Sequence, residues 1–128
     1  MVQTFNSKSA PKAVGPYSHG AICEGILYLS GQLGLDPKTN ALAPGGVLAE
    51  ATQALKNITN ILEEVGADFH QVIQTRLYLT DLNDFAAVNQ LYGQILGEAK
   101  PARTTVQVAA LPLGGAIEIE MLIKLPTT

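Results

Sequence analysis

Cysteine and histidine, two of the residue types that most often bind transition metals, are scarce in this sequence. The single cysteine, Cys23, excludes an intramolecular disulfide and any cysteine-rich metal site. The two histidines, His19 and His70, lie far apart in the sequence, so a zinc site is not expected either. We therefore expect a chain that folds and acts without a metal or any other cofactor, with these three residues in structural or surface roles.

Charged residues are also few, at 15% of the chain against about 25% in a typical soluble domain. The 8 Lys and Arg residues are scattered singly among 11 Asp and Glu residues. A protein that binds nucleic acid through its phosphates needs clustered basic side chains, so no nucleic-acid partner is expected. Hydrophobic residues reach 47%, more than the polar groups of one chain can easily cover, and this balance first indicates an oligomer.

Long apolar runs are absent. No run approaches the roughly 18 residues that a transmembrane helix needs, and the first residues lack the apolar segment of a signal peptide. We therefore expect no membrane partner and a cytoplasmic location. The length of 128 residues fits one domain, residues 1–128, that is large enough to bury a hydrophobic core.

The spacing of apolar residues predicts two helices and several strands. Apolar residues recur three and four positions apart from residue 47 until Gly66, and again from Phe85 until Gly97, which is typical of amphipathic helices. Residues 33–47 contain several prolines and glycines and predict a loop. The expected strands cover residues 2–5, the two arms of a hairpin that turns at Glu24-Gly25, and residues 72–80, 104–110 and 116–125.

The same pattern predicts which strand residues face the core. The run Ile26–Leu29 is apolar at every position, as in a strand that is buried on both faces, and Ile73, Leu77 and Leu79 are expected on one buried face. Two helices can cover only one face of one sheet. The fold class is therefore α/β (α+β), with a single mixed β-sheet and two helices packed on one face. The residues expected on the other face are Arg76, Tyr78, Glu118, Glu120 and Leu122.

That second face is mixed in character, partly apolar and partly charged. A face of this kind suits an assembly in which the sheets of several subunits meet around a common axis. A pocket between subunits could then collect polar groups from two chains.

Five short motifs resemble, in order and spacing, those of the RidA/YjgF family of reactive intermediate imine/enamine deaminases. They are GPYS at 15–18, LSGQ at 29–32, DLNDF at 81–85 with VN at 88–89, PART at 101–104 and IEIE at 117–120. Each motif alone is weak evidence, but together they extend over almost the whole chain. The resemblance implies a chorismate-mutase-like fold and a homotrimer with active sites at the subunit interfaces.

The resemblance also implies a reaction. Such a protein hydrolyses 2-iminobutanoate and 2-iminopropanoate, or the enamine 2-aminoacrylate, released by pyridoxal-phosphate enzymes, to 2-keto acids and ammonia. It would be a cytoplasmic hydrolase that acts on C=N bonds and limits metabolite damage, with a small 2-imino or 2-keto carboxylate as its ligand.

Water addition to a C=N bond beside a carboxylate needs a carboxylate anchor, a held water and a supply of protons. Arg103 is the predicted anchor, because a guanidinium binds a carboxylate bidentately and the resemblance places the family's essential arginine there. Glu118 is predicted to position and polarise the water, with a pKa raised by partial burial. The resemblance favours Glu118 over Glu120. Without the resemblance, the sequence favours a solvated Arg at a strand start for Arg103, and half of an exposed pair with Glu120 stays open as an alternative for Glu118.

The resemblance adds five residues to the predicted substrate-binding set. Tyr17 would close the site, and Gly31 would let the backbone approach the ligand. Thr105 stands where many family members have cysteine, and it would act through its backbone carbonyl toward the substrate nitrogen. Ser30 and Asn89 match polar pocket residues of the family. Without the resemblance, Tyr17 is a packed loop aromatic, Ser30 a strand-end hydroxyl and Asn89 an exposed helix residue.

Two other classes of function remain open. A non-catalytic sensor or regulator that binds small carboxylates or keto acids would use Arg103 but would not need Glu118, so Glu118→Gln would spare binding in that case. The third class is an RNA-directed nuclease or a protein holdase. The acidic balance of the chain and the absence of a basic stripe count against the nuclease.

Overall fold

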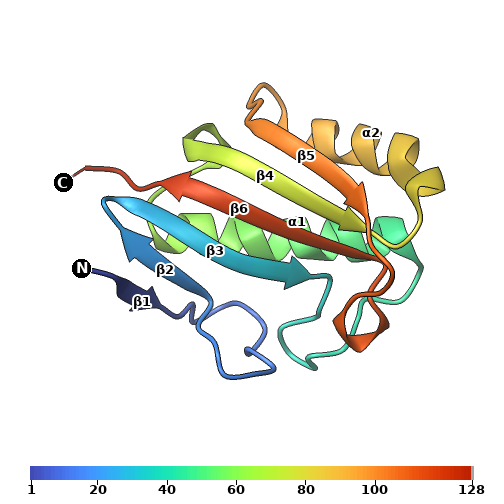
Figure 1. Cartoon of the computed structure of the whole chain (residues 1–128), viewed down its shortest axis with the longest axis horizontal. Coiled ribbons are helices and arrows are strands. Elements are labelled where there is room, and N and C mark those ends of the chain that lie inside the picture. Colours follow the sequence, from blue (N-terminus) through green and yellow to red (C-terminus); the bar gives the residue numbers. More distant parts are fainter. Residues whose placement is uncertain (128) are drawn as a thin grey trace.

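The computed structural model describes residues 1–127, which form one mixed β-sheet with two α-helices against one of its faces (Figure 1). The elements are β1 (Gln3–Phe5), β2 (Gly20–Cys23), β3 (Ile26–Leu33), α1 (Val47–Glu64), β4 (Val72–Leu79), α2 (Phe85–Leu96), β5 (Ala102–Gln107) and β6 (Ile117–Lys124). The order across the sheet is β1-β2-β3-β6-β4-β5; β4 and β5 are parallel and all other neighbours are antiparallel. The predicted α+β class with a single mixed sheet is confirmed. Neither helix is long and apolar enough to cross a membrane within the described residues.

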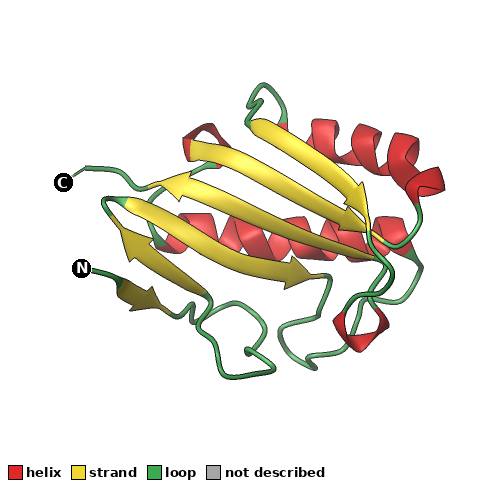
Figure 2. Ribbon diagram, in the orientation of Figure 1, coloured by secondary structure: helices red, strands yellow, loops and turns green. Residues whose placement is uncertain are grey.

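The hydrophobic core lies between the two helices and the face of the sheet that they cover. Figure 2 shows α1 behind the central strands and α2 beside β5. Alternate residues of β6 point into this core, and Ile117, Ile119, Met121 and Ile123 are at most 1% exposed. The apolar helix residues buried with them are Ala51, Ala54, Leu55, Ile58, Ile61 and Leu62 of α1 and Val88, Tyr92 and Leu96 of α2. Burial of each large aliphatic side chain contributes about 1.5–3 kcal/mol, so the core determines which way each strand faces.

The boundaries of the elements lie close to those that the sequence predicts. Gly66 and Gly97 follow the last turns of α1 and α2. The hairpin between β2 and β3 turns at Glu24 and Gly25, whose φ angles of 53° and 74° are the left-handed pair that a type I′ turn requires. β5 spans residues 102–107 instead of 104–110, so this strand begins and ends earlier than expected.

Two predictions about which strand residues are buried are wrong, each for a physical reason. Ile26–Leu29 is not buried on both faces, because no helix covers the second face in this chain and Tyr28 is 46% exposed. Ile73 is 43% exposed, because a register shift between Val72 and Gln74 in the pairing of β4 with β6 turns it out of the core. Val72, at 6% exposed, takes the buried position that the simple alternation assigns to Ile73.

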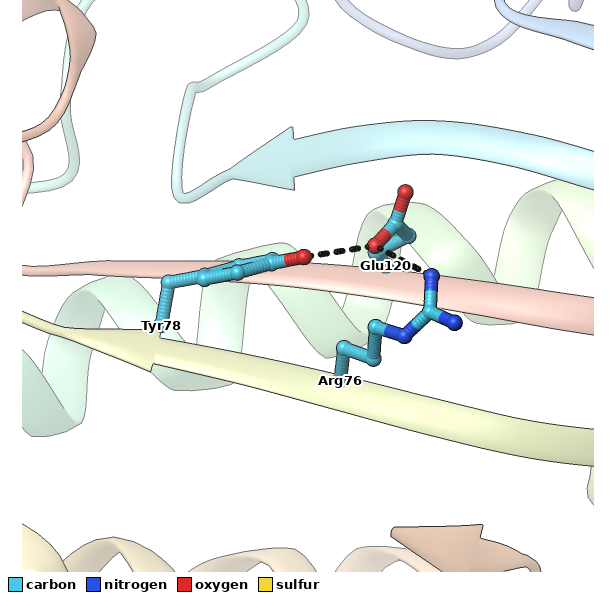
Figure 3. A network of polar contacts seen from close by, with 3 residues as sticks. All are labelled: Arg76, Tyr78 and Glu120. Carbon is cyan, nitrogen blue, oxygen red and sulfur yellow. Dashed lines mark hydrogen bonds and ion pairs between the residues drawn. The ribbon is translucent and has the colours of Figure 1, made fainter. Parts of the chain in front are cut away.

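The face of the sheet away from the helices carries a polar network at its centre. Arg76 and Tyr78 of β4 both point toward Glu120 of β6 (Figure 3). The Tyr78 hydroxyl donates to Glu120 Oε1 at 2.7 Å, and Arg76 Nη1 lies 3.4 Å from the same oxygen. The hydrogen bond to Glu120 raises the pKa of Tyr78, because the phenol must stay protonated to donate it. The sequence prediction that these residues share the uncovered face is confirmed.

The close approach of β3 to α1 makes a stability prediction. Gly34 directly follows β3, and a Cβ built on it would lie 2.3 Å from the carbonyl oxygen of Glu50 and 2.5 Å from its Cα. These are backbone atoms of α1, so Gly34→Ala must displace the helix. We expect a loss of about 3 kcal/mol or more in the free energy of unfolding, measured by thermal and urea denaturation.

Gly115→Ala is the matched control. Its added methyl would meet Leu33 Cδ2 at 3.0 Å, which is the end of a flexible side chain, and its φ of −62° suits any residue. We expect this variant to lose about 1 kcal/mol or less. Equal losses in the two variants would contradict the close-approach argument.

Candidate functional site

A recess of about 40 Å³ opens beside the carboxyl group of Glu118, and we call it the Glu118 recess. It is lined by Pro11, Lys12, Ala13, Val14, Tyr17, His19, Gly31, Gln32, Leu33, Leu35, Pro112 and Glu118. Glu118 belongs to β6 and points to the uncovered face, since its neighbours Ile117 and Ile119 are buried under the helices. The recess therefore lies at the end of β3 and the start of β6, away from both helices.

A β-bulge in β3 makes the space for the Glu118 carboxyl group. The pairing of β3 with β6 shifts between Leu29 and Gln32, so Ser30 and Gly31 bulge out of the ladder. A Cβ on Gly31 would lie 2.7 Å from Glu118 Cδ and 2.8 Å from Oε2, so any other residue here would push this carboxyl group out of its place. The sequence predicted that Gly31 lets the backbone approach a ligand. In this chain the group that approaches it is the side chain of Glu118.

The environment of Glu118 changes its acidity. Burial raises the pKa of Glu118, and the negative charge of Glu120 on the same face of β6 raises it further. A carboxyl group with a raised pKa holds its proton nearer to neutral pH, where it can both accept and return a proton. The sequence predicts that partial burial raises the pKa of Glu118, and the structure gives a shift in the same direction.

Tyr17 lies on the wall of the Glu118 recess in the loop that precedes β2. Its side chain is 51% exposed, and its hydroxyl accepts a hydrogen bond from the Val14 N–H at 3.4 Å. The structure therefore brings Tyr17, Gly31 and Glu118 to one place. An exposed tyrosine at the mouth of a recess has a free face for a ligand or for a second chain.

His19 organises this loop, which is a structural role of the kind expected for it, although its partners were not predicted. Its ring is buried, with Nδ1 accepting from the Ser7 N–H and Nε2 donating to the Pro11 carbonyl, both at 2.8 Å. A carbonyl can only accept, so these two bonds define the Nε2–H tautomer. The bonds join segments of irregular chain, which carry no periodic pattern from which the contact could be read.

Ser30 ties β3 to the same loop. Its hydroxyl donates to the Ser18 carbonyl at 2.8 Å, and its N–H donates to the His19 carbonyl at 2.8 Å. Ser30 is not among the residues that line the Glu118 recess. Its hydroxyl is thus engaged by the protein, in agreement with the plainer reading of a strand-end hydroxyl.

A second depression lies beside Arg103 at the other edge of the sheet, and we call it the Arg103 groove. It is lined by Asn89, Tyr92, Gly93, Leu96, Gly97, Ala99, Lys100, Pro101 and Arg103. Arg103 lies opposite Thr75 in the parallel pairing of β5 with β4, and Thr75 is fully buried on the helix side. The groove is therefore formed between β5 and α2, on the face of the sheet that the helices cover.

Two aromatic rings hold the Arg103 guanidinium. Its Cζ lies 5.0 Å from the ring centre of Tyr92 and 5.7 Å from that of Phe85, both on α2. Within residues 1–127, the ion pair of Arg76 with Glu120 is the only one, so Arg103 has no acidic partner there. Its donors are oriented but free, which is the arrangement that binds a carboxylate bidentately. Phe85 and Tyr92 lie in the helix that the sequence predicts, but their contact with Arg103 was not predicted.

Asn89 and Thr105 lie near Arg103 in different ways. Asn89 is exposed and lines the Arg103 groove. Thr105 is on the same side of β5 as Arg103, but its Oγ1 is buried and has no hydrogen-bond partner in the described chain. The hydroxyl of Thr105 therefore faces protein and cannot reach a ligand in the groove, which leaves its backbone as the part available for binding.

The predicted site residues thus form two groups on opposite faces of one sheet. Glu118 points away from the helices, whereas Arg103 points toward α2. One short substrate cannot contact both side chains of the same chain. No group of three or more metal-binding side chains occurs in residues 1–127.

Comparison with known proteins identifies one family along most of the chain. Residues 7–124 match the family described as Endoribonuclease L-PSP. The 2-iminobutanoate/2-iminopropanoate deaminase of Capra hircus is 49% identical over 118 residues, which cover 92% of this chain and 86% of the relative. The range that matches the family includes both groups of site residues.

Solved structures with the same fold are also similar in sequence. RidA from the Antarctic bacterium Psychrobacter sp. PAMC 21119 is 44% identical, with a TM-score of 0.90 over 96% of this chain and 99% of that chain. E. coli TdcF with bound serine is 33% identical, with a TM-score of 0.88 over 98% of this chain and 99% of that chain. The sheet and both helices therefore belong to a fold already seen in experimental structures.

Two threonines with buried hydroxyl groups, on neighbouring strands, predict opposite effects of the same substitution to valine. Thr105→Val removes a hydroxyl that is buried without a partner, so we expect the free energy of unfolding to rise by about 1 kcal/mol. Thr75→Val removes the acceptor of the Tyr92 hydroxyl, which donates to Thr75 Oγ1 at 3.0 Å, so we expect a loss of about 1–2 kcal/mol. Thermal denaturation of both variants measures the difference, and a loss of stability in Thr105→Val would contradict it.

The raised pKa of Glu118 predicts how stability depends on pH. The stabilisation that comes from the protonated form is complete below the ordinary glutamate pKa of about 4.3, and it is lost as the pH rises through the raised pKa of the folded state. Glu118→Gln should therefore melt at a higher temperature than the wild type at pH 7, and the difference should shrink as the pH falls to 4. Glu63→Gln, at an exposed position of α1, controls for the loss of one charge. A Glu118→Gln variant that is less stable at pH 7 would refute the assignment.

Proposed function

The chain belongs to the Endoribonuclease L-PSP family, the RidA/YjgF family of the sequence resemblance, and we propose that it is an imine deaminase. Its substrates are short 2-imino carboxylates, 2-iminobutanoate and 2-iminopropanoate, and its products are 2-keto acids and ammonia. The observation that supports this proposal most directly is the Arg103 guanidinium, which two aromatic rings orient and no acidic side chain neutralises within the described residues. Deaminases that are 45% and 49% identical to this chain are among its relatives.

The chemistry uses the two groups of residues in different roles. Arg103 binds the substrate carboxylate with two parallel hydrogen bonds and thereby fixes the position of the adjacent C=N carbon. Glu118 holds a water molecule, whose oxygen forms a bond with that carbon while one proton passes through the carboxyl group to the nitrogen. The tetrahedral adduct then breaks its C–N bond, its hydroxyl proton goes to the nitrogen, and ammonia leaves. Both hydrogens of the water end on ammonia, and no electrons are exchanged, so no cofactor is needed.

We infer that the site forms between two chains. Arg103 and Glu118 lie on opposite faces of the sheet in one chain, so a substrate that contacts both must take them from different chains. An interface between two different surfaces is heterologous, and copies joined in this way form a ring if the rotation between them closes. The resemblance makes the ring a homotrimer. The uncovered face, with the exposed Tyr28, and the 47% hydrophobic content give the chain apolar surface to bury there.

The remaining predicted residues take supporting roles in this proposal. Tyr17 covers the substrate from the wall of the Glu118 recess, and Gly31 leaves room for the Glu118 carboxyl group. Asn89 adds a polar group beside Arg103, and the Thr105 backbone carbonyl accepts from the substrate nitrogen. Ser30 contributes by holding the Tyr17 loop through Ser18.

The cellular role follows from the chemistry of the substrate. Short 2-imines are reactive and arise when pyridoxal-phosphate enzymes eliminate water from amino acids, so their removal is damage control. The free thiol of Cys23 and the absence of any other cysteine are consistent with a cytoplasmic setting.

The family description names RNA cleavage, but the charges of this chain favour a small ligand. Its 11 acidic residues outnumber its 8 basic residues, and Arg103 is enclosed between β5 and α2 instead of forming part of a basic surface. RNA binding through phosphates needs several such residues together. We therefore propose no nucleic-acid partner and no membrane partner. A carboxylate sensor would share Arg103, and turnover distinguishes it from an enzyme.

The test is a coupled assay in which a threonine or serine dehydratase generates the imine and semicarbazide traps what remains. We expect the wild type to divert the imine to the keto acid. Arg103→Ala, which loses the carboxylate anchor, and Glu118→Gln, which loses the proton acceptor, should each lower kcat/KM by about 100-fold or more. Arg103→Ala should also lose binding of a 2-keto acid by calorimetry, whereas Glu118→Gln should keep it. A wild type that never exceeds the uncatalysed rate but still binds the keto acid would make the protein a sensor.

Mixing the two inactive variants tests whether the site is shared between chains. After co-refolding of Arg103→Ala with Glu118→Gln in equal amounts, random assembly leaves roughly a quarter of the shared sites with both wild-type residues. We therefore expect the mixture to regain a substantial part of the wild-type activity. A site within one chain predicts no recovery at all, because every chain in the mixture lacks one of the two residues.

A further inference from the structure

The side chain of Glu50 is a buried carboxyl group that the proposed chemistry does not use. Glu50 lies in the first turn of α1, where the helix dipole favours an acidic side chain, and it is only 7% exposed. Its Oε1 accepts a hydrogen bond from the Ala116 N–H at 2.8 Å. Acidic side chains are almost never buried to this degree unless they have a partner. The hydrogen bond from Ala116 is that partner, and it accounts for the burial of Glu50.

Ala116 directly precedes β6, and both of its backbone groups are bound. Its N–H donates to Glu50, and its carbonyl accepts from the Thr80 N–H at 3.2 Å. The preceding turn contains Leu113 with a φ of 60°, a conformation that costs a non-glycine residue about 1 kcal/mol or more. Such a turn does not hold the start of β6 by itself. The bonds to Glu50 and Thr80 hold it, and Glu118 follows two residues later.

Glu50 also contacts the other strand of the Glu118 recess. Its backbone packs against Gly34 so closely that no Cβ fits there. Gly34 follows Gly31 by three residues, and Gly31 lies beneath the Glu118 carboxyl group. One residue of α1 thus holds the end of β3 through its backbone and the start of β6 through its side chain.

We propose that Glu50 is a positioning residue for Glu118, which sets where the Glu118 carboxyl group lies over Gly31 by bonding the Ala116 N–H. The proposal rests on the proposed function, since it assigns the Glu118 carboxyl group the task of holding water. Glu50 does not touch the substrate. Its loss therefore changes the rate of the chemical step more than the affinity for the imine, because that affinity comes mainly from Arg103.

Three substitutions separate the hydrogen bond from the charge. Glu50→Gln keeps an acceptor oxygen at the same reach, Glu50→Asp keeps the acid but withdraws it by one methylene, and Glu50→Met removes both. In the coupled assay we expect kcat to fall about tenfold or more in the Asp and Met variants, with KM changed by less than about threefold. Glu50→Gln should stay within about twofold of the wild type. A Gln variant as slow as the Met variant would overturn the proposal, because the charge and not the bond would then matter.

Stability needs a matched control, because a buried variant can lose activity simply by loosening the fold. Ile61→Val and Ile61→Ala lower the stability in two steps on the same helix, and Ile61 does not line the recess. If the Asp and Met variants have the same kcat as Ile61 variants of equal melting temperature, Glu50 is merely structural and the proposal fails. Glu50→Asp keeps the test available if Glu50→Met does not fold.

A carbon-13 titration of the Glu118 carboxyl group provides a readout that does not depend on activity. When the start of β6 loosens, Glu118 becomes more hydrated, so its titration midpoint should move toward the ordinary glutamate value in the Asp and Met variants and remain unchanged in the Gln variant. An unchanged midpoint in all three variants would overturn the proposal. A wild type without deaminase activity would instead refute the proposed function, and this titration would still decide the role of Glu50.

Discussion

Every candidate functional side chain in this protein is placed by the alternation of residues across one sheet that helices cover on one face only. The apolar residues of β6 are drawn into the core beneath α1, and this turns Glu118 and Glu120 to the opposite face. In β5 the same rule turns Arg103 toward α2. The separation of Arg103 from Glu118 therefore follows from hydrophobic burial, and a site that uses both requires a second chain.

Local irregularities then adapt this regular frame to chemistry. The bulge in β3 places Gly31 beside Glu118, and the Glu118 carboxyl group occupies the space that a side chain at residue 31 would fill. The His19 ring makes hydrogen bonds to two segments of irregular chain, and the loop that contains it places Tyr17 at the same recess. The two aromatic residues beneath Arg103 have a comparable role, because they orient a cation without neutralising it. In each case, contacts within the protein hold a polar group of the candidate site in place. For Glu118, partial burial also raises the pKa.

Much of the fold could be read from the sequence because its signals are local. The three- and four-residue spacing in α1 and the strict alternation in β6 each need only a short stretch of chain to be visible. The predictions failed where the exposure of a residue depends on elements far from it in the sequence. Ile73 is exposed because of a register shift in its pairing with β6, and Tyr28 is exposed because no element of this chain covers it. The motifs around Arg103 and Glu118 indicated which residues to consider, but not that they lie on opposite faces.

The sequence by itself determined the order of helices and strands, most of the core residues and the family to which the chain belongs, because periodicity and motifs are properties of neighbouring residues. Only the tertiary structure decided that Gly31 lies beneath Glu118, that Glu50 holds the start of β6 and that Arg103 stacks on α2. These contacts join residues far apart in the chain. They form only when the strands are paired in their final register and both helices are packed on one face of the sheet.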